Sequence, residues 1–567
     1  GMPSVKGSSK RDEDRPWKND MWLPRAISKV GDDCPPNWLT ACSKYANADS
    51  EHTLYLGLEM ERLIKERGLW AIYEHRLHLP RVACEMECYG VTAIGTYTDA
   101  TIREYEQYVA EESDELVTIA AEYGHKLELA EGASINDNMR DFFYGAVRQE
   151  CSRCSYTKRI KHWAGEMEKG EVCPKCAKST KRRQGMSHQL EVKRCENLAL
   201  PVVYNNKRVN GSLDKEAMAE YLATVDGNAY EFIRLLFDKR GHDTALVYME
   251  AYRRFWMPVP GRPGFYRIHP SLNPCATDHL RWASNSPNLQ NVSGDSKEIS
   301  NRACFGPLPD REWWRMDFKS IENRIPAYES NQEEMIELFE RPTEPPYYGS
   351  YYLLNASITC PDLFWPLSER EGAFKREQPV AYKQVKFGTL AMQYGCGEEK
   401  ADRLYRMQGA YSLLKNKLPK LTALQYKYLG IAERTGFVET LPDRSVDPTR
   451  GYPILASRTE DGRVLSTTPF NYHVSGTACW VKNTALIRCA DQCAQWQKDG
   501  FDAHVILEIH DEILFDLPRG TTMEDNLPRA MVLKGLMEQS GEDLIPCIPT
   551  PVSVEYHTES WAQGIQI

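Results

Sequence analysis

The sequence predicts a multi-domain protein of mixed α and β structure (α+β) organised around one β-hairpin. At 567 residues the chain is long enough for several domains with more than one core. Residues 505–518 read VILEIHDEILFDLP, in which apolar residues run up to His510-Asp511-Glu512 and resume directly after it. That pattern is typical of two strands that meet at a tight polar turn. Helical apolar spacing earlier in the chain supplies the α component.

The predicted turn carries two carboxylates, Asp511 and Glu512, with no lysine or arginine beside them in the sequence. Two such groups repel each other unless a cation lies near, and hard divalent cations are the usual partners. A solvated surface hairpin is the alternative, because a three-residue motif is short. A second acidic turn favours the metal site. In residues 311–324, REWWRMDFKSIENR, an apolar approach ends in Asp317, and Glu322 follows five residues later.

Composition limits the class of protein. No apolar run approaches the roughly 18 residues of a membrane span, and the N-terminal residues lack the apolar centre of a signal peptide. We therefore expect a cytoplasmic protein in a reducing compartment, whose 17 cysteines are thiols or metal ligands. The net charge of -10 argues weakly against nucleic acid as a partner, but local patches decide that question.

The N-terminal part is predicted to be helical once the chain becomes ordered. Residues up to about Lys44 are rich in Gly, Ser, Pro and charge, so we expect partial disorder there and ordered structure from near Tyr45. Residues 54–68 have helical apolar spacing, residues 69–91 continue as helix, turn and helix, and residues 100–150 look helical and acidic. Further on, Ser212 is a suitable N-cap for a helix that begins at Leu213.

Four cysteines predict a structural zinc site. Cys151-x-x-Cys154 and Cys173-x-x-Cys176 are separated by 18 residues, a spacing that lets two CxxC pairs form one tetrahedral site. Four unrelated buried thiols are the alternative. Between Cys151 and Cys195 the chain has twelve Lys or Arg against four Glu, a net of +8. Such a patch could follow phosphates, or it could be a solvated basic surface.

The two acidic turns carry a family resemblance. Residues 317–324, DFKSIENR, resemble the first palm motif of family A DNA polymerases, the bacterial DNA polymerase I type, and His510-Asp511-Glu512 resembles the last. The resemblance implies a right-hand fold of palm, fingers and thumb, here with a small zinc-ribbon-like insertion. The implied parts are a mostly disordered N-terminus with an exonuclease-domain remnant (1–53), entry helices and thumb (54–250, with the insert at about 148–197), palm (251–334), fingers (335–434) and palm again (435–567).

Further segments resemble other parts of that family. They are residues 198–222 between thumb and palm, 279–292 (HLRWASNSPNLQNV) along the primer, and 436–444 and 471–478 in the palm. Arg281 matches the family's arginine in the primer minor groove, where one side chain can test pair geometry without reading sequence. The family's usual Gly-Arg-Leu-Ser is replaced around it by Leu280-Arg281-Trp282-Ala283, and Ser475 stands where glutamine is usual. The implied DNA contacts are Arg281, Gln290, Asn291, Asn471 and Ser475.

Residues 381–394, AYKQVKFGTLAMQY, match the family's nucleotide-binding helix in two registers. One register uses Lys383 and Phe387 but leaves the tyrosine three residues late. The other places Lys386, Leu390 and Tyr394 at i, i+4 and i+8 on one helix face, and we prefer it. In that register Tyr382 replaces the family's arginine and Leu390 its aromatic residue, so Lys383 would take over the phosphate contact. An ordinary amphipathic helix is the alternative.

The resemblance implies a template-directed DNA polymerase that binds primer-template DNA and dNTPs. Asp317 and Asp511, with the Phe318 carbonyl, would hold two Mg²⁺ ions, while Lys386 would contact the phosphates. Glu322 would exclude a 2′-hydroxyl, and His510 and Glu512 would lie at the primer terminus. We expect a monomer that acts in phage or viral replication, in the host cytoplasm if the source is a virus, with a separate exonuclease or replisome factor as a further partner.

The same resemblance predicts that this chain does not proofread. Tyr45-Ala46-Asn47-Ala48-Asp49 resembles the last motif of the family's 3′-5′ exonuclease domain, but fewer than 50 residues precede it. Asp49 alone could not hold two metals, so the helix is interpreted as a structural joint. A single-subunit RNA polymerase and a non-catalytic DNA-binding protein on a polymerase scaffold are the alternative functions.

Overall fold

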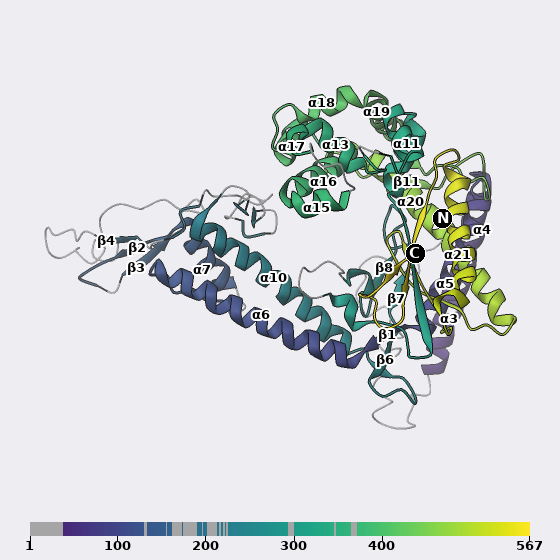
Figure 1. Cartoon of the computed structure of the whole chain (residues 1–567), viewed down its shortest axis with the longest axis horizontal. Coiled ribbons are helices and arrows are strands. Elements are labelled where there is room, and N and C mark those ends of the chain that lie inside the picture. The colour runs from purple at the N-terminus through teal and green to yellow at the C-terminus, as the bar shows by residue number, and fades with distance from the viewer. Residues whose placement is uncertain are drawn as a thin grey trace.

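A five-stranded antiparallel sheet forms the centre of the protein (Figure 1). The computed structural model describes residues 38–129, 133–154, 156–161, 173, 190–194, 197–200, 212–214, 217–218, 221–222, 225–292, 300–344, 347–364 and 371–567. The strand order in the central sheet is β12-β13-β9-β14-β15. Its strands are β9 (Arg311–Phe318), β12 (His504–Ile509), β13 (Glu512–Pro518), β14 (Val552–His557) and β15 (Ile565–Gln566).

Both faces of this sheet are covered, because successive side chains of a strand point to opposite sides. On one face Trp314 and Met316 pack with the helices α20 (Thr468–Lys498) and α21 (Leu527–Leu544). On the other face Trp313 packs with Phe305 and Trp561 in a separate core. This double coverage explains why the uncharged residues of β9 and β13 are apolar and almost all buried.

Two long helices form an arm that extends from the sheet (Figure 1). α6 (Gly95–Glu122) packs along α10 (Gly227–Arg253), and α7 (Ala133–Tyr144) joins them in a third core built on Phe142, Phe143 and Phe232. The tip of the arm carries a three-stranded antiparallel sheet of order β3-β2-β4. Its strands are β2 (Val147–Glu150), β3 (Thr157–Ile160) and β4 (Glu191–Arg194).

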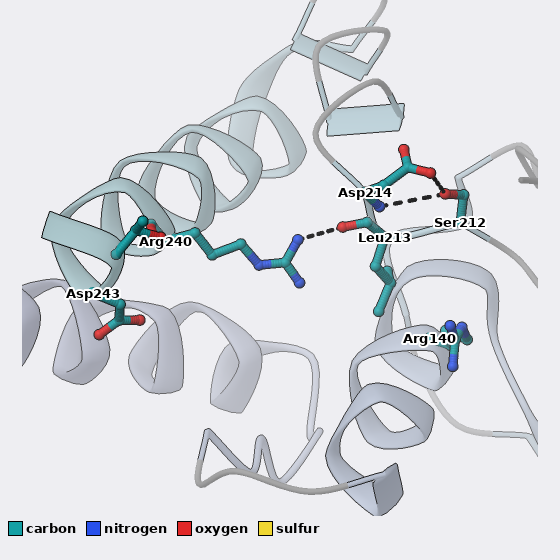
Figure 2. Close-up of a pocket in the computed structure, with 7 residues that line it drawn as sticks. Arg140, Ser212, Leu213, Asp214, Arg240 and Asp243 are labelled. Carbon is teal, nitrogen blue, oxygen red and sulfur yellow. Dashed lines mark hydrogen bonds between the residues drawn. The ribbon is translucent and has the colours of Figure 1, made fainter. Parts of the chain in front are cut away.

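A cavity of about 510 Å³ opens on this arm, between α7 and α10. Arg240 reaches across it and donates a hydrogen bond to the carbonyl of Leu213 (Figure 2). The cavity is lined by Arg140, Ser212, Leu213, Asp214, Arg240, Asp243 and Thr244. The capping prediction is wrong here, because Leu213 is not helical and Asp214 accepts the hydrogen bond from the Ala217 N–H at 2.9 Å.

A helical lobe lies at the top of Figure 1, above the central sheet. α16 begins with Pro379 at its first turn and ends before Gly395, whose φ of +75° closes the helix. The lobe consists of α11 (Ile321–Ser330), α12 (Glu333–Glu340), α13 (Tyr351–Thr359), α14 (Pro361–Phe364), α15 (Glu371–Glu377), α16 (Pro379–Gln393), α17 (Glu398–Tyr405), α18 (Ala410–Lys417) and α19 (Pro419–Thr435).

The last of three N-terminal helices packs against β12 of the central sheet and against α20. The first helix begins at Trp38, earlier than the predicted start near Tyr45, and the second helical hairpin ends at Tyr89, so Val91 is in a strand and not in a helix. These helices are α3 (Trp38–Glu66), α4 (Trp70–Arg76) and α5 (His78–Tyr89). Short elements complete the body: β1 (Val91–Ile94), β5 (Met257–Pro258), β6 (Phe265–Ile268), β7 (Ser271–Asn273), β8 (Ala283–Asn285), η3 (Leu289–Asn291), η4 (Asn301–Cys304), β10 (Phe437–Glu439), β11 (Pro453–Leu455) and η5 (Met523–Asp525).

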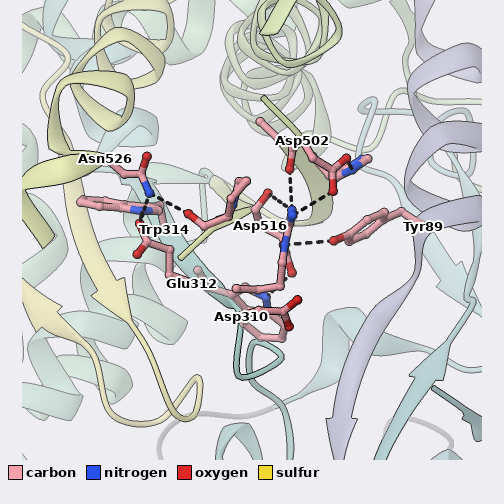
Figure 3. Close-up of polar contacts among 12 residues, drawn as sticks. Tyr89, Asp310, Glu312, Trp314, Asp502, Asp516 and Asn526 are labelled. Carbon is pink, nitrogen blue, oxygen red and sulfur yellow. Dashed lines mark hydrogen bonds and ion pairs between the residues drawn. The ribbon is translucent and has the colours of Figure 1, made fainter. Parts of the chain in front are cut away.

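A buried polar cluster ties β9 to β13 and α5 (Figure 3). Asp516, which is fully buried, accepts hydrogen bonds from Arg311, from the Trp313 indole at 2.9 Å and from the Tyr89 hydroxyl at 3.0 Å. Arg311 also lies 2.9 Å from the exposed Asp502. Since a buried carboxylate is tolerated only when its oxygens are satisfied, these donors fix the position of β13 against β9.

We predict that Asp516→Ala destabilises the protein by about 3–5 kcal/mol, because it removes the buried carboxylate that pairs with Arg311 and takes this acceptor from the Trp313 indole and the Tyr89 hydroxyl. Asp461→Ala removes an exposed ion pair with Arg463 and serves as the control, with a change below about 1 kcal/mol. Urea unfolding measures both variants. Equal stability losses in the two would contradict a special role for the buried cluster.

Candidate active site

The register of the central sheet places Asp317 and Asp511 at the same edge. β9 and β13 run antiparallel with Asp317 opposite Glu512, and β14 places Ser553 on the other side of Asp317. His510 and Asp511 form the two-residue turn between Ile509 and Glu512. The Phe318 N–H then donates to the Asp511 carbonyl at 3.2 Å, so the turn folds back beside the end of β9. The tight turn predicted from the sequence is confirmed.

The two aspartates share an environment that disfavours their negative charge. Burial, together with the Glu512 carboxylate, raises the pKa of Asp317 to about 6. Burial also raises the pKa of Asp511 to about 7, with Glu322 and Asp317 adding to the rise. Carboxylates that are costly to ionise until a cation arrives are suited to a divalent metal site. The residues present therefore fit the expected Mg²⁺.

Glu512 has basic partners that the local sequence did not reveal. Its Oε2 lies 2.6 Å from Arg315 and 3.4 Å from Arg302, and Arg315 also pairs with Glu555 at 2.8 Å. No lysine or arginine is adjacent to Asp511 and Glu512 in the sequence, but in the fold two arginines lie close to the Glu512 carboxylate. Glu512 Oε1 is also buried, and it has no hydrogen-bond partner within the described part of the chain.

Glu322 is the centre of a polar cluster beside the aspartates. Its carboxylate accepts from Arg281 at 2.7 Å, from the Tyr394 hydroxyl at 2.6 Å and from Ser475 at 2.9 Å. The Gln393 amide donates to the Glu322 carbonyl at 2.7 Å. Three residues predicted from separate segments thus donate to the carboxylate of a fourth, Glu322. Gln393 was not predicted.

Asn471 and His510 lie close to these two groups of acids. Asn471 Oδ1 is 3.0 Å from the Ser475 hydroxyl, which links it to the Glu322 cluster. His510 is at the turn with φ +56°, and burial lowers its pKa, so its imidazole is neutral at pH 7. A neutral ring in this position can accept or donate one hydrogen bond.

One face of α16 carries both predicted sets of nucleotide-binding residues. Lys383, Phe387, Leu390 and Tyr394 follow one another at helical spacing, and Lys386 borders the same face. Phe387 is 56% exposed. The preference for the register of Lys386, Leu390 and Tyr394 stays a prediction. Tyr382 is buried and donates to Glu371 at 2.6 Å, so it cannot replace the family's arginine on this face.

The remaining predicted DNA contacts lie on η3. The Gln290 amide donates to Glu508, and the Asn291 amide donates to Tyr248 at 3.2 Å. Glu508 also pairs with Lys482 at 2.6 Å. Sequence analysis missed Lys482 and Glu508. The available signal was a single charged residue within each of two mostly apolar stretches, residues 478–487 and 505–509.

Three of the predicted zinc ligands meet at the tip of the arm. The sulfur atoms of Cys151, Cys154 and Cys173 lie within 4.8 Å of one another, and Cys176 lies outside the described residues. The Cys151 N–H donates to the Tyr156 carbonyl at 3.0 Å and closes the turn between β2 and β3. The backbone N–H of Arg153 lowers the pKa of Cys151 to about 7, which favours the thiolate that a metal binds. This donor set fits one Zn²⁺.

Comparison with known proteins identifies the family. Residues 175–563 match the family model described as DNA polymerase family A. The chain belongs to this family. The predicted family resemblance is thereby confirmed. Within the described residues, no helix is both long and apolar enough to cross a bilayer.

Individual relatives are distant. The chain is 25% identical to the thermostable DNA polymerase I of Thermus aquaticus over 305 residues, which are 53% of this chain and 33% of that protein. It is 26% identical to DNA polymerase I of Bacillus subtilis over 275 residues, 46% of this chain and 28% of that one. The chain thus spans about a third of the length of these family A relatives.

A solved structure shares the fold. It is the POL domain of Pol1 from M. smegmatis in complex with DNA primer-template and dNTP, with a TM-score of 0.57 and 16% identity. The match covers 86% of this chain and 70% of that one. A mixed helix and sheet fold of the family A polymerase type is therefore confirmed.

We predict that Asp511→Asn stabilises the metal-free protein at pH 8. The folded state raises the pKa of Asp511 from 3.8 to about 7, so wild-type stability falls as pH rises through this window and stays low above it. The amide escapes this loss and should raise Tm at pH 8 by about 2 °C, with no gain at pH 4. Thermal unfolding without divalent cations measures the effect, and Asp310→Asn, at an exposed position, is the control. An equal gain at both pH values would contradict the assignment.

Proposed function

We propose that the chain is a template-directed DNA polymerase that extends a primer 3′-hydroxyl with dNTPs. The observation that carries the proposal is the pair Asp317 and Asp511, held at one sheet edge with raised pKa values. Membership of DNA polymerase family A supports it. The solved structure of similar fold is described as a complex with DNA primer-template and dNTP, which supports the same partners here.

We assign the parts of the fold accordingly. The central sheet with its helices, residues 251–334 and 435–567, acts as the palm. The part of the helical lobe within residues 335–434 acts as the fingers, and the arm within residues 54–250 acts as the thumb. This assignment places α16 over the edge that carries the two aspartates, as the Tyr394–Glu322 contact requires.

Asp317, Asp511 and the Phe318 carbonyl would hold the two Mg²⁺ ions. When bound, these ions supply charge that activates the primer 3′-hydroxyl and neutralises the triphosphate. Lys386 and Lys383 bind the phosphates from α16 as point charges, and Leu390 packs against the base. Arg281 and Asn471 contact the primer end, and His510 and Glu512 border its terminus. Glu512 is held there by Arg315 and Arg302.

Glu322 excludes ribonucleotides in this proposal. Donors from Arg281, Tyr394 and Ser475 hold its carboxylate in one place, so it cannot move aside for a 2′-hydroxyl. The donors come from three separate segments: Arg281 lies just before β8, Tyr394 directly follows α16, and Ser475 lies in α20. A rigid carboxylate discriminates better than a mobile one. Tyr394 closes the site next to the template base.

The cysteine insert is a structural zinc site in our proposal. Cys151, Cys154, Cys173 and Cys176 supply four ligands, which leaves no open position for chemistry. The basic residues of the insert would then contact DNA phosphates from the tip of the arm. A phage or viral setting, a monomeric state and a separate exonuclease or replisome factor stay predictions, as does the absence of proofreading through Asp49.

Asp317→Ala or Asp511→Ala should lower primer extension by about 10³-fold or more, because either change removes one of the two carboxylates that would hold the Mg²⁺ ions. Binding of primer-template should change less than about threefold, since phosphate contacts elsewhere supply most of the affinity. Gel assays of extension and binding measure both effects, and Asp310→Ala is the control. Extension that survives in either variant would refute the metal assignment.

Glu322→Ala should raise rNTP use relative to dNTP use by about tenfold or more, because it opens space beneath the sugar. Ser475→Ala, which keeps the carboxylate and removes one of its donors, should change the ratio much less. Single-nucleotide incorporation with matched dNTP and rNTP gives the ratio. An unchanged ratio in Glu322→Ala would show that another residue discriminates.

Cys173→Ser should lower zinc content from about one ion per chain while palm catalysis on short primers persists. Cys275→Ser, at an exposed cysteine outside the cluster, should leave zinc content unchanged. Elemental analysis of protein purified without chelator provides the measurement. Wild-type protein without zinc would refute this site and leave the polymerase proposal untouched.

A further inference from the structure

A buried ion pair lies directly behind the candidate active site. Lys482 of α20 and Glu508 of β12 are 2.6 Å apart, and each side chain is only 1% exposed. Glu508 is three residues before Asp511 on the strand that leads into the turn. A pair taken fully out of water gains little net stability, since desolvation offsets the attraction. Its place beside the aspartates therefore needs another explanation.

The pair controls the position of Gln290. The two carboxylate oxygens of Glu508 are divided, with Oε2 bound to Lys482 and Oε1 accepting from the Gln290 amide. Gln290 is partly exposed on η3, and the hydrogen bond to Glu508 anchors its side-chain amide. Because Lys482 fixes the rotamer of Glu508, it also fixes where the Gln290 side chain can lie.

Lys482 touches the other side of the site as well. Its ammonium lies 4.9 Å from the centre of the Trp282 ring, and the Trp282 indole donates to Asn483 at 2.8 Å. Trp282 directly follows Arg281 in the chain. The lysine thus packs between the segments that carry Arg281 and Gln290, and a cation over an indole face in a dry site is a favourable contact.

The same face of α20 connects these contacts to the Glu322 cluster. Asn471, Ser475, Cys479 and Lys482 follow one another at spacings of four, four and three residues. Ser475 contacts Glu322 at one end, and Lys482 contacts Glu508 at the other. One face of α20 therefore connects Glu322, the proposed sugar discriminator, with Glu508 and its partner Gln290.

We propose that Lys482 is a positioning residue, which acts through Glu508 to hold the Gln290 amide against the primer terminus. The proposal rests on the proposed polymerase function. Lys482 touches no substrate in it. The consequence is that primer extension, and not primer binding, depends on a buried ion pair that the chain does not need for its fold.

A mutant cycle tests the proposal. Lys482→Met together with Glu508→Leu replaces the pair by apolar side chains of similar size, so no lone charge stays buried. Gln290→Ala removes the anchored amide. We expect each change to lower the single-turnover extension rate by about tenfold, and the triple variant to be no slower than Gln290→Ala alone. Primer-template affinity should stay within about threefold of wild type in all three.

Controls separate positioning from stability. Arg488→Met with Asp543→Leu removes a partly buried ion pair between α20 and α21, whose charged atoms lie 2.6 Å apart. This change should leave the extension rate unchanged. If the apolar double variant does not fold, Glu508→Gln replaces it, because one amide oxygen cannot satisfy both Lys482 and Gln290. Glu508→Gln should slow extension, and it should have no further effect once Gln290 is alanine.

The outcomes are distinct. Losses that multiply in the combined variant would overturn the proposal, since the pair would then act independently of Gln290. Full extension activity without the pair would overturn it too. Wild-type protein that extends no primer would instead refute the proposed function itself, before the cycle begins.

Discussion

The antiparallel register between β9 and β13 is the constraint on which the site depends. It sets Asp317 opposite Glu512 and brings the Phe318 N–H to the Asp511 carbonyl. A shift of this register by one residue would move the Asp317 side chain to the opposite face of the sheet and take Trp313 and Trp314 out of their cores. Asp516, with its three donors, resists that shift from the far end of the same strand pair.

Within the described residues, Asp511 has no ion-pair partner and Asp317 has only a distant one, whereas the neighbouring glutamates have close basic partners. Arg315 and Arg302 engage Glu512, Arg281 engages Glu322, and Lys482 engages Glu508. Each of these basic residues lies 3.4 Å or less from its acid, while the Asp317 carboxylate lies 3.7 Å from Arg315. Burial is the main cause of the raised pKa values of Asp317 and Asp511, and the neighbouring acids Glu512 and Glu322 add to the rise. Functional sites commonly retain such an unfavourable arrangement because a ligand relieves it.

Local sequence predicted the elements and much of the site. The turn at His510-Asp511, the α16 helix and the CxxC turn follow from short-range patterns, and residues 317–324 carried the family. The partners of Glu512 could not be predicted in this way, because cross-strand neighbours depend on register and not on adjacency. The Lys482–Glu508 pair could not be predicted from local sequence either, because its two residues lie 26 positions apart, one on a helix and the other on a strand. Ser212 was a reasonable N-cap by type, yet Asp214, two residues on, takes the bond.

Direct counting of bound ions tests the central claim that Asp317 and Asp511 form a two-metal site. Mn²⁺ can replace Mg²⁺ at oxygen ligands and can be counted by electron paramagnetic resonance as free ion disappears. With primer-template and a non-hydrolysable dNTP analogue present, the account predicts two tightly bound Mn²⁺ per wild-type chain and fewer than one in Asp317→Asn/Asp511→Asn. Equal Mn²⁺ binding by both proteins would contradict it.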